Sequence, residues 1–348
     1  MNRLRRMVPR GLIRRVRNIQ HRAQVRAIQR AHARALPAAP ASTLPLALVI
    51  PVHNDADRLA RLLDRAQAMG VFNQIVVIDD GSDIPVQIDD VTLIRHETPL
   101  GPGPARNAGL AAVTLPHVLF CDSDDLLLPD LAALLADLAD LADTGAFDFC
   151  LFKHADSRFS NAGHWGQPDW DEAFWQDAGL AVGALQDAPR VAWPLLAQTA
   201  NYPWNKIYRT AFLRDHSIGC ADTPVHEDIT LHWLGFAHAT RILTSDRICV
   251  WHMIAGAGRQ TDRRGAERLA VFDALAPVVA ATRDADMRAA LVTFVLGLAD
   301  WIKGTLDTAH HAAFDGALQD WLSGSVSGWN ADIAAIDPVL AARTKAQR

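Results

Sequence analysis

His117-Val-Leu-Phe-Cys-Asp-Ser-Asp-Asp125 joins a short apolar run directly to three carboxylates. The run is too short for a helix and rich in apolar residues, so it predicts a buried strand over 117–121. Acids this close repel one another unless a cation neutralises them, and hard oxygen ligands suit Mn²⁺ or Mg²⁺. Acids also gather at helix starts, and Asp125 or Asp130 could instead cap a helix over 131–141. The stretch therefore predicts a strand followed by a metal site or by a helix cap.

Further strands and helices are expected upstream of this stretch. Apolar runs predict buried strands over 46–51 and 74–79, and a third strand over 91–95. Asn54 or Asp55 can cap a first helix that Gly70 ends, and a second helix is expected to start near 105. Strands that alternate with helices predict an α/β fold, a Rossmann-like and mostly parallel sheet flanked by helices. Its ligand crevice should lie beyond the carboxyl ends of the strands.

The chain is expected to divide into three parts: a basic helical arm and linker over 1–45, the α/β domain over 46–260, and a helical extension over 261–348. Residues 1–35 hold eleven arginines and no acid, so the rest of the chain is strongly acidic. An acidic body argues against nucleic acid as a partner. The arm can contact an anionic membrane, or it can be a solvated or protein-docking helix.

The cysteines and the hydropathy pattern bear on the compartment. Cys121, Cys150, Cys220 and Cys249 form no Cys-x-x-Cys pair, and we expect reduced, mostly buried thiols. No apolar run reaches the ~18 residues of a bilayer span. We therefore expect a cytoplasmic protein, peripheral at the inner face of the membrane if the arm binds lipid.

Four motifs occur in order along the chain. They are Val49-Ile-Pro-Val-His-Asn54, Val77-Ile-Asp-Asp-Gly-Ser82, Ala105-Arg-Asn-Ala-Gly109 and Phe120-Cys-Asp-Ser-Asp-Asp125. With them, and with Pro203-Trp-Asn-Lys-Ile-Tyr-Arg209 and His226-Glu-Asp228, the chain resembles the inverting glycosyltransferases of family 2 over roughly residues 46–255. The resemblance implies a GT-A fold. It also implies transfer of one sugar from a nucleotide-sugar donor, with UDP expected, to a saccharide or lipid-linked acceptor.

The resemblance also implies a role for each matching residue. Pro51, His53 and Asp55 would line the nucleotide pocket, with Asp80 accepting a hydrogen bond from the base and Arg106 facing the nucleotide or its phosphates. Asp122 and Asp124 match the motif that binds a divalent metal, Mn²⁺ or Mg²⁺, and the diphosphate; Asp124 is the expected direct ligand. Asp228, in a pair with Glu227, matches the catalytic base. Lys206 matches a segment associated with the substrate groove.

Other interpretations of these residues stay open. Asp228 can equally be a helix-start acid, Arg106 a surface arginine and Asn107 a plain cap. His252, after a strand over 248–251, is either a late metal ligand or an ordinary satisfied histidine. His53 stands where the family has tyrosine, so base stacking there would be weaker.

The sequence fits other functions less well than the transfer of a single sugar. Gln260-Thr-Asp-Arg-Arg264 resembles the Gln-x-x-Arg-Trp of processive synthases, but arginine replaces tryptophan and no membrane span is expected, so single transfers are favoured. A sugar-nucleotide nucleotidyltransferase would need a glycine-rich loop after the first strand, and a dehydrogenase would need Gly-x-Gly-x-x-Gly there. The chain has neither motif, because Pro-Val-His-Asn-Asp follows instead over 51–55. A degenerate, non-catalytic scaffold is the remaining alternative, and the combined presence of Asp80, Asp122, Asp124 and Asp228 argues against it.

Overall fold

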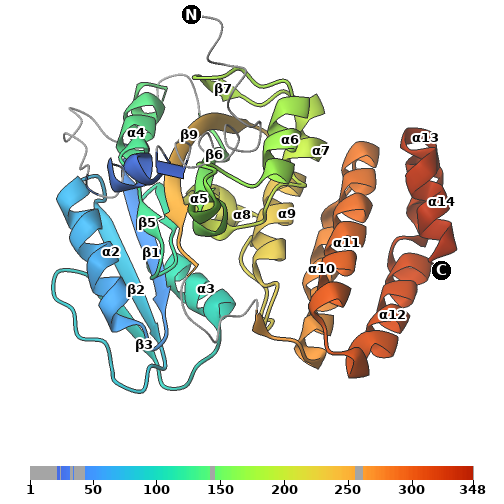
Figure 1. Ribbon diagram of the computed structural model, residues 1–348, viewed down its shortest axis with the longest axis horizontal. Coiled ribbons are helices and arrows are strands. Elements are labelled where there is room, and N and C mark those ends of the chain that lie inside the picture. Colours follow the sequence, from blue (N-terminus) through green and yellow to red (C-terminus); the bar gives the residue numbers. More distant parts are fainter. Residues whose placement is uncertain are drawn as a thin grey trace, which may run out of the picture.

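The structure is a computed structural model that describes residues 22–23, 25–31, 34, 44–141, 146–254 and 262–347. It is an α/β fold, with a twisted sheet in one half and a group of helices packed beside it (Figure 1). The strands are β1 Leu46–Val52, β2 Gln74–Asp80, β3 Thr92–His96, β4 His117–Phe120, β5 Leu126–Leu127, β6 Phe149–Asp156, β7 Leu185–Asp187, β8 Lys206–Arg209 and β9 Ile242–His252. The α-helices are α2 Ala56–Met69, α3 Pro102–Ala112, α4 Asp130–Asp140, α5 Ser157–Ala162, α6 Asp169–Asp177, α7 Trp193–Leu196, α8 Thr210–Asp215, α9 Asp228–His238, α10 Val271–Ala281, α11 Ala285–Thr305, α12 His311–Asp320, α13 Asn330–Ile336 and α14 Pro338–Ala346.

The sheet confirms the expected strands and their direction. Its order is β3-β2-β1-β4-β8-β6-β9-β5, with β7 paired to β9. The four strands predicted between residues 46 and 121, which are β3-β2-β1-β4, are parallel neighbours. Because the chain goes from β1 outward to β2 and later returns to the other side of β1 as β4, the order reverses between β1 and β4. Ligand crevices form at such a reversal point.

The strand β1 shows why these residues form the centre of the sheet. All seven of its residues are buried, and successive side chains point to opposite faces. Ala47 and Val49 belong to the apolar cluster on one face, whereas Leu46, Leu48 and Ile50 belong to the cluster on the other. A strand covered on both faces reads as a continuous apolar run, which is the pattern that predicted it.

The second half of the sheet departs from the parallel pattern. The strand β8 lies antiparallel between β4 and β6. The strands β6 and β9 are again parallel, and the short strand β5 pairs antiparallel with β9 directly after the acidic cluster. This pairing brings the end of β9, and with it His252, next to the acids that follow β4.

The helices start and end near the expected positions, with two corrections at their caps. Asp55 precedes α2 without a side-chain capping bond, and Gly70 ends the helix in the left-handed conformation. The helix α3 begins at Pro102, one turn before the expected start. Asp130 lies in the first turn of α4, but Asp125 does not cap that helix because its carboxylate pairs with His252 instead.

The C-terminal helices pack directly on the α/β part. One apolar cluster includes residues of the sheet, of α9 and of α10 to α14. At this junction Thr230 Oγ1 donates to Ala274 O at 3.1 Å, and the rings of Trp233 and Phe294 lie 5.2 Å apart. The described residues before and after the boundary expected at 260/261 therefore share one apolar core.

The expectations for the arm and the cysteines can be followed only in part. The described residues between 22 and 34 are helical, with Val25 and Gln29 buried; the rest of the arm and the linker up to residue 43 lie outside the described residues. All four cysteines are free and buried, as expected. Among the described helices, none has the length and apolarity needed to cross a bilayer.

Candidate functional site

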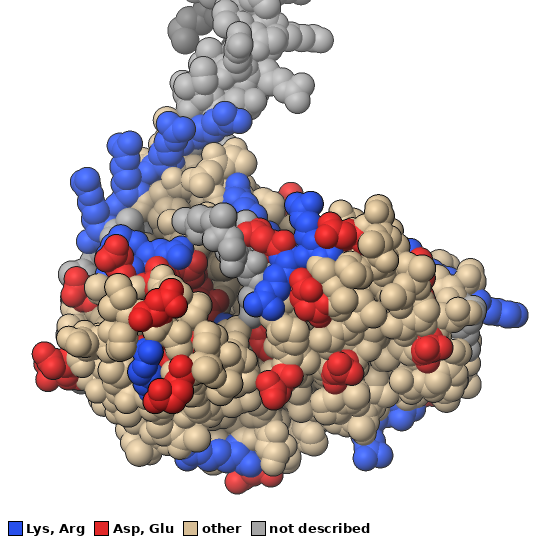
Figure 2. Space-filling model, turned by 90° about the horizontal axis from the view of Figure 1, so that it is seen from below, with Lys and Arg blue, Asp and Glu red and all other residues tan. Residues whose placement is uncertain are grey.

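A cleft of about 930 Å³ opens at the carboxyl ends of β1 and β4. In a view onto these strand ends, Figure 2 shows a hollow with acidic and basic side chains on its rim. Nine of the ten predicted site residues line this cleft: Pro51, His53, Asp80, Arg106, Asp122, Asp124, Glu227, Asp228 and His252. The fold thus brings together residues from six separate segments of the sequence.

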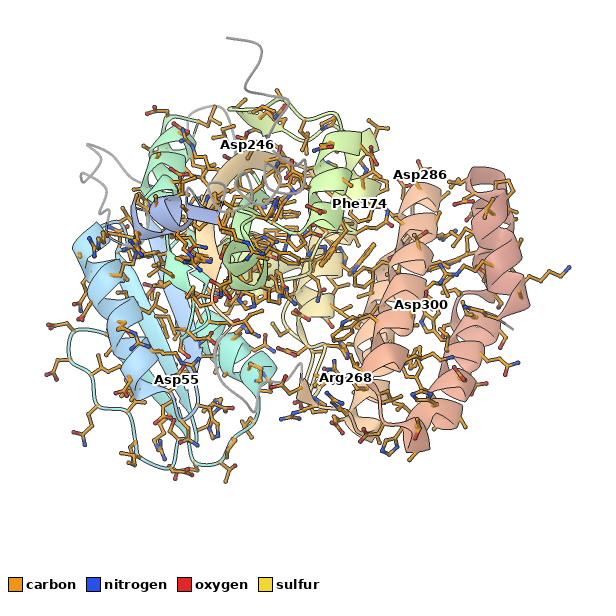
Figure 3. All side chains as sticks on the ribbon, viewed as in Figure 1. Asp55, Phe174, Asp246, Arg268, Asp286 and Asp300 are labelled. Carbon is orange, nitrogen blue, oxygen red and sulfur yellow. The ribbon has the colours of Figure 1, made fainter. Side chains whose placement is uncertain are left out.

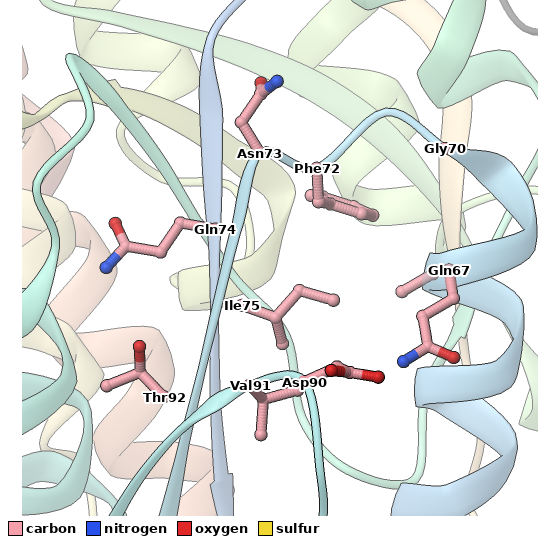
Figure 4. A pocket seen from close by; sticks show the side chains of 10 residues that line it. Gln67, Gly70, Phe72, Asn73, Gln74, Ile75, Asp90, Val91 and Thr92 are labelled. Atoms are coloured by element: carbon pink, nitrogen blue, oxygen red, sulfur yellow. The ribbon is translucent and has the colours of Figure 1, made fainter.

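A second cavity, of about 480 Å³, lies elsewhere, between the end of α2 and the starts of β2 and β3 (Figure 4). Its lining includes Gln67, Asn73, Gln74 and Asp90. The amides of Gln74 and Asn73 already bond the backbone at Ala112 and Leu46. One carboxylate among uncharged groups offers little for catalysis, so the candidate site is the larger cleft.

Arg106 is the central cation of the cleft. It lies on α3 with its side chain 5% exposed, and donates to Asp122 Oδ1 at 2.6 Å and to Glu227 Oε1 at 3.0 Å. Asp122 follows β4, whereas Glu227 directly precedes α9, so one guanidinium joins the two acidic segments. The possible surface position of Arg106 is therefore excluded, since a buried arginine flanked by two carboxylates is structurally fixed.

The rest of the Ala-Arg-Asn-Ala-Gly motif explains how α3 is held in place. Asn107 is not a cap: its side chain accepts from Cys220 N at 2.9 Å and donates to Cys220 O at 2.8 Å. Gly109 lets the helix approach the sheet, because an added Cβ would lie 2.4 Å from Val49 Cγ1. At Gly103 an added Cβ would lie 2.3 Å from Ala221 O. The motif therefore fixes Arg106 against the sheet and against the segment 219–227.

Asp80 holds the loop that forms one wall of the cleft. Its Oδ1 accepts from Leu100 N at 2.9 Å and from His96 Nδ1 at 2.7 Å, and its Oδ2 accepts from Gly101 N at 2.8 Å. His53 Nδ1 bonds the carbonyl of Asp80 at 2.8 Å. Because both carboxylate oxygens already have donors, Asp80 first of all orders residues 99–101.

Asp55 is the one predicted site residue that does not line the cleft. Figure 3 shows it at the base of α2, on the side of the molecule where the strands end. Its carboxylate accepts from Arg58 Nε at 2.6 Å and from Ser123 Oγ at 2.9 Å. Asp55 was expected in the pocket lining, and this is corrected. The residue instead links the acidic turn, residues 122–125, to α2.

Asp124 presents a carboxylate to the cleft that is 23% exposed, with Arg58 Nη1 at 3.3 Å. Burial, together with the charges of Asp125 and Asp122, raises the pKa of Asp124 to about 7. A carboxylate whose ionised form is disfavoured by like charges gains from a nearby cation. Among the described residues, however, no three His, Cys, Asp or Glu side chains gather in a ready metal site.

His252 and Asp125 form a buried pair beside Asp124. His252 Nδ1 lies 2.8 Å from Asp125 Oδ1, which also accepts from Met253 N at 2.9 Å. Burial opposes the charge of His252, but Asp125 outweighs it and raises the pKa of His252 to about 9. The imidazole stacks on Trp204 with a centroid distance of 5.1 Å. Its Nδ1 hydrogen therefore points to Asp125, which leaves Nε2 as the atom available to a ligand.

Glu227 and Asp228 stand at the start of α9 and have different surroundings. Glu227 is committed to Arg106, whereas Asp228 lines the cleft without a side-chain ion pair in the described part of the chain. Burial and the charge of Glu227 raise the pKa of Asp228 to about 8. The backbone at His226 has a φ of +64°, which turns the chain sharply before these two acids.

Lys206 does not line the cleft. It is fully buried at the start of β8, and its Nζ donates to Tyr202 O at 3.0 Å and to Asn205 Oδ1 at 2.5 Å. Burial lowers the pKa of Lys206 to about 7. The residue holds the turn that carries Tyr202 and Trp204, and both of these aromatics line the cleft.

Sequence reasoning did not assign several other residues that line the cleft, among them Arg158, Arg263, Arg264 and Thr305. Arg158 forks onto the buried Asp156, with Nη2 to Oδ2 at 2.6 Å. A hint for Arg263 and Arg264 was present in the Gln260–Arg264 stretch, which was used only to argue against a processive enzyme. Gln260 and Thr261 themselves lie outside the described residues.

Comparisons with known proteins agree with this geometry. Residues 47–186 match the model of Glycosyl transferase family 2. A stretch of 84 residues is 40% identical to the pre-mycofactocin glycosyltransferase of Mycobacterium tuberculosis, covering 22% of this chain and 17% of that protein. Another of 102 residues is 36% identical to the succinoglycan biosynthesis protein ExoO of Rhizobium meliloti, covering 27% and 29%. The matches thus span less than a third of either relative.

The fold is shared with a solved structure over nearly the whole chain. Residues 1–349 of S. aureus TarS, crystallised with UDP-GlcNAc, superpose with a TM-score of 0.65 at 19% identity, over 87% of this chain and 88% of that one. The superposition extends beyond the family match into the C-terminal helices. Residues 47–186, which contain the four motifs, match glycosyltransferase family 2, and the chain has the GT-A type of fold.

Proposed function

We propose that the protein transfers a single sugar, with inversion, from a UDP-sugar to a hydroxyl of a saccharide or lipid-linked acceptor. The observation that carries the proposal is the convergence of Asp122, Asp124 and Asp228 on one cleft. The first two follow β4, where a donor diphosphate fits, and the third comes from a segment more than a hundred residues away. Displacing a nucleoside diphosphate needs charge stabilisation on the leaving group and a base at the attacking hydroxyl.

For the metal, we propose Mn²⁺ or Mg²⁺ held by Asp124, with Asp122 and His252 Nε2 as further ligands. Two carboxylates and one imidazole line this cleft, and Asp125 orients the imidazole as outer carboxylates commonly do. Because the pKa of His252 is raised to about 9, its Nε2 would bind the metal by releasing a proton. Because the described residues alone make no three-ligand cluster, the diphosphate oxygens must complete the shell, as is usual for Mg²⁺ with nucleotides. When bound, the metal would neutralise charge on the departing diphosphate.

For the base, we propose Asp228 alone. Glu227 is paired with Arg106 and is better suited to hold that guanidinium in place. Asp228 has a pKa raised to about 8, close to the range in which a general base works best near neutral pH. Glu227 is paired with a cation, whereas Asp228 has a raised pKa, and two neighbouring acids in such different surroundings take different roles.

For the donor, we propose that the uracil binds between His53 and the loop that Asp80 orders. The solved complex of TarS contains UDP-GlcNAc, and its fold matches this chain over the whole region of the cleft. His53 offers a smaller ring than tyrosine for stacking. Tyr202 lines the cleft beside His252, stacked at 4.4 Å on the fully buried Trp204, and suits contact with a sugar ring.

The test is hydrolysis of a panel of UDP-sugars with Mn²⁺, with and without Asp124→Asn. We expect one UDP-sugar to be hydrolysed slowly in the absence of acceptor and to stabilise the protein against heat. Asp124→Asn should lower this rate by about a hundredfold, a loss typical of a removed charge at a reacting diphosphate. If no UDP-sugar binds, or if the variant hydrolyses as fast as the wild type, the proposed chemistry is wrong.

We also propose that the arm contacts anionic membrane on the cytoplasmic side. Arg22, Arg26, Arg30 and Arg34 are all exposed and recur every four residues along the arm, whereas Val25 and Gln29 are buried. Figure 2 shows basic side chains projecting from the upper left of the molecule. Each arginine near an anionic surface contributes about 1 kcal/mol. Arg22→Gln/Arg26→Gln/Arg30→Gln should cosediment less with phosphatidylserine vesicles than the wild type, and equal cosedimentation would contradict the proposal.

A further inference from the structure

The wall of the cleft opposite the acidic turn is made by the C-terminal part of the chain. Asp262, Arg263 and Arg264 line it from the segment before α10, and Thr305 lines it from the last turn of α11. These residues lie well beyond the stretch 47–186 that matches the family model. This wall of the cleft therefore comes from a part of the chain that the family match does not cover.

The backbone beneath the two arginines is fixed. Arg264 O accepts from Asp307 N at 2.9 Å, and Arg263 O accepts from Arg268 Nε at 3.0 Å. Arg268 is itself anchored, since it is 2% exposed and its guanidinium lies 4.8 Å from the ring centroid of Trp301. Figure 3 shows Arg268 at the base of the C-terminal helices, on the same side of the molecule as Asp55. The side chains of Arg263 and Arg264 are exposed above this support.

Arg263 and Arg264 differ from the other arginines of the cleft in that no carboxylate of the described residues pairs with them. Arg106 is compensated by Asp122 and Glu227, and Arg158 by Asp156. The side chains of Arg263 and Arg264 make no hydrogen bond or ion pair with any described residue. Glu267 acts on Arg263 only at a distance, and its carboxylate accepts from Gly265 N at 3.1 Å. Two positive charges therefore face the cleft without a paired acid in the described part of the chain.

The position of these charges points to the acceptor. Arg268 Nη1 lies 3.3 Å from His226 Nε2, two residues before Asp228, while Arg268 Nε bonds the carbonyl of Arg263. One side chain thus joins the basic wall to the segment of the proposed base. The donor groups lie on the other side of the cleft: His53 directly follows β1, and Asp80 is the last residue of β2. A group bound at Arg263 lies on the side where the attacking hydroxyl must approach Asp228.

We propose that Arg263 and Arg264, with Thr305 beside them, form a subsite for an anionic group of the acceptor, a phosphate or a carboxylate close to the reacting hydroxyl. The proposal rests on the proposed glycosyl transfer and names the class of its acceptor. An acidic cleft repels an anionic saccharide, and two arginines at the acceptor end offset this repulsion and fix its register. Arginine suits the task because its planar fork binds carboxylate and phosphate through two parallel hydrogen bonds.

The test compares three probes in the presence of UDP and Mn²⁺: trigalacturonate, glucose 6-phosphate and maltotriose. By calorimetric titration, the wild type should bind at least one anionic probe about tenfold more tightly than neutral maltotriose, a difference of about 1.4 kcal/mol. The two anionic probes distinguish a carboxylate from a phosphate. Arg263→Gln/Arg264→Gln should remove the preference and leave the affinity for UDP unchanged.

Arg283→Gln is the matched control, because Arg283 is exposed, lies in the same helical region and does not line the cleft. It should keep the preference for the anionic probe. The proposal is overturned if maltotriose binds as tightly as both anionic probes, or if Arg263→Gln/Arg264→Gln weakens UDP and the anionic probe in parallel, which would make the arginines a clamp for the donor diphosphate. Absence of UDP binding by the wild type would instead contradict the proposed function itself.

Discussion

Asp228 is at once the first residue of α9 and a wall residue of the cleft. The sequence offered these two interpretations as alternatives, yet they are compatible in one side chain. The helix start supplies backbone N–H groups that favour a nearby negative charge, whereas burial and Glu227 disfavour it. The second influence is the stronger one, since the pKa of Asp228 is raised to about 8.

A pH dependence of catalysis follows from this raised pKa. If Asp228 is the base, kcat/KM should rise as the pH approaches 8 and level off above it, because only the ionised carboxylate accepts the proton. Asp228→Asn should lower kcat by about a thousandfold. The same variant should be at least as stable as the wild type above pH 8, since it removes a charge that folding disfavours. Rate measurements across pH check the activity, and melting curves across pH check the stability. A variant that is inactive because it is unfolded would show a lower melting temperature than the wild type.

Individual residues were predictable where their role is local, and not where it depends on distant partners. The acids after β4 were found because they follow a strand directly. The pairing of Asp125 with His252 spans 127 positions, and the tie from Asn107 to Cys220 spans 113. For both residues a helix cap, which is the local role of Asp and Asn, was therefore one of the alternatives left open. Only the folded arrangement of β9 beside β5 and of α3 beside the segment 219–227 reveals their partners.

At the scale of elements, the parallel strands were predictable and the inserted strand β8 was not. The strands β1, β2 and β4 are buried on both faces and are continuous apolar runs in the sequence. The strand β8 has only four residues and includes Lys206 and Arg209, so its sequence has no apolar run. It pairs with β4 and β6 because Lys206 is satisfied by Tyr202 O and Asn205 Oδ1 at its buried end.

The contact between α3 and the start of α9 gives a prediction for an element. Gly103→Ala would place a Cβ 2.3 Å from Ala221 O and 3.0 Å from Glu227 Cβ, so α3 must move away from the segment that carries Asp228. We expect kcat to fall by about a hundredfold, as small displacements of catalytic groups commonly do. Gly297→Ala is the matched control: it lies on α11 with open space around it, and should add about 0.8 kcal/mol of stability without loss of activity. Equal activity of both variants would mean that this contact does not position the base.

At the scale of the molecule, the C-terminal helices belong to the same core as the sheet. One apolar cluster includes Val49 of β1, Phe149 of β6, Trp233 of α9 and Val295 of α11. The helices also contribute Thr305 to the cleft and anchor Arg268, so the core and the site both cross the expected boundary at 260/261. The helical periodicity of this region was readable from the sequence. That its apolar stripes face the sheet domain was not, because a stripe does not name the surface that it covers.

A shared core predicts shared unfolding. Differential scanning calorimetry should give one transition with equal calorimetric and van't Hoff enthalpies, because exposing α10 and α11 also exposes the faces of α9 and of the sheet that they cover. UDP with Mn²⁺ at about a hundred times its Kd should raise the free energy of unfolding of that single transition by about 2.7 kcal/mol. Two transitions, of which only the first responds to UDP, would instead make residues 46–260 an independent domain. The basic wall formed by Arg263 and Arg264 would then be a detachable part of the site, and the acceptor would bind at the junction of two units that can move apart.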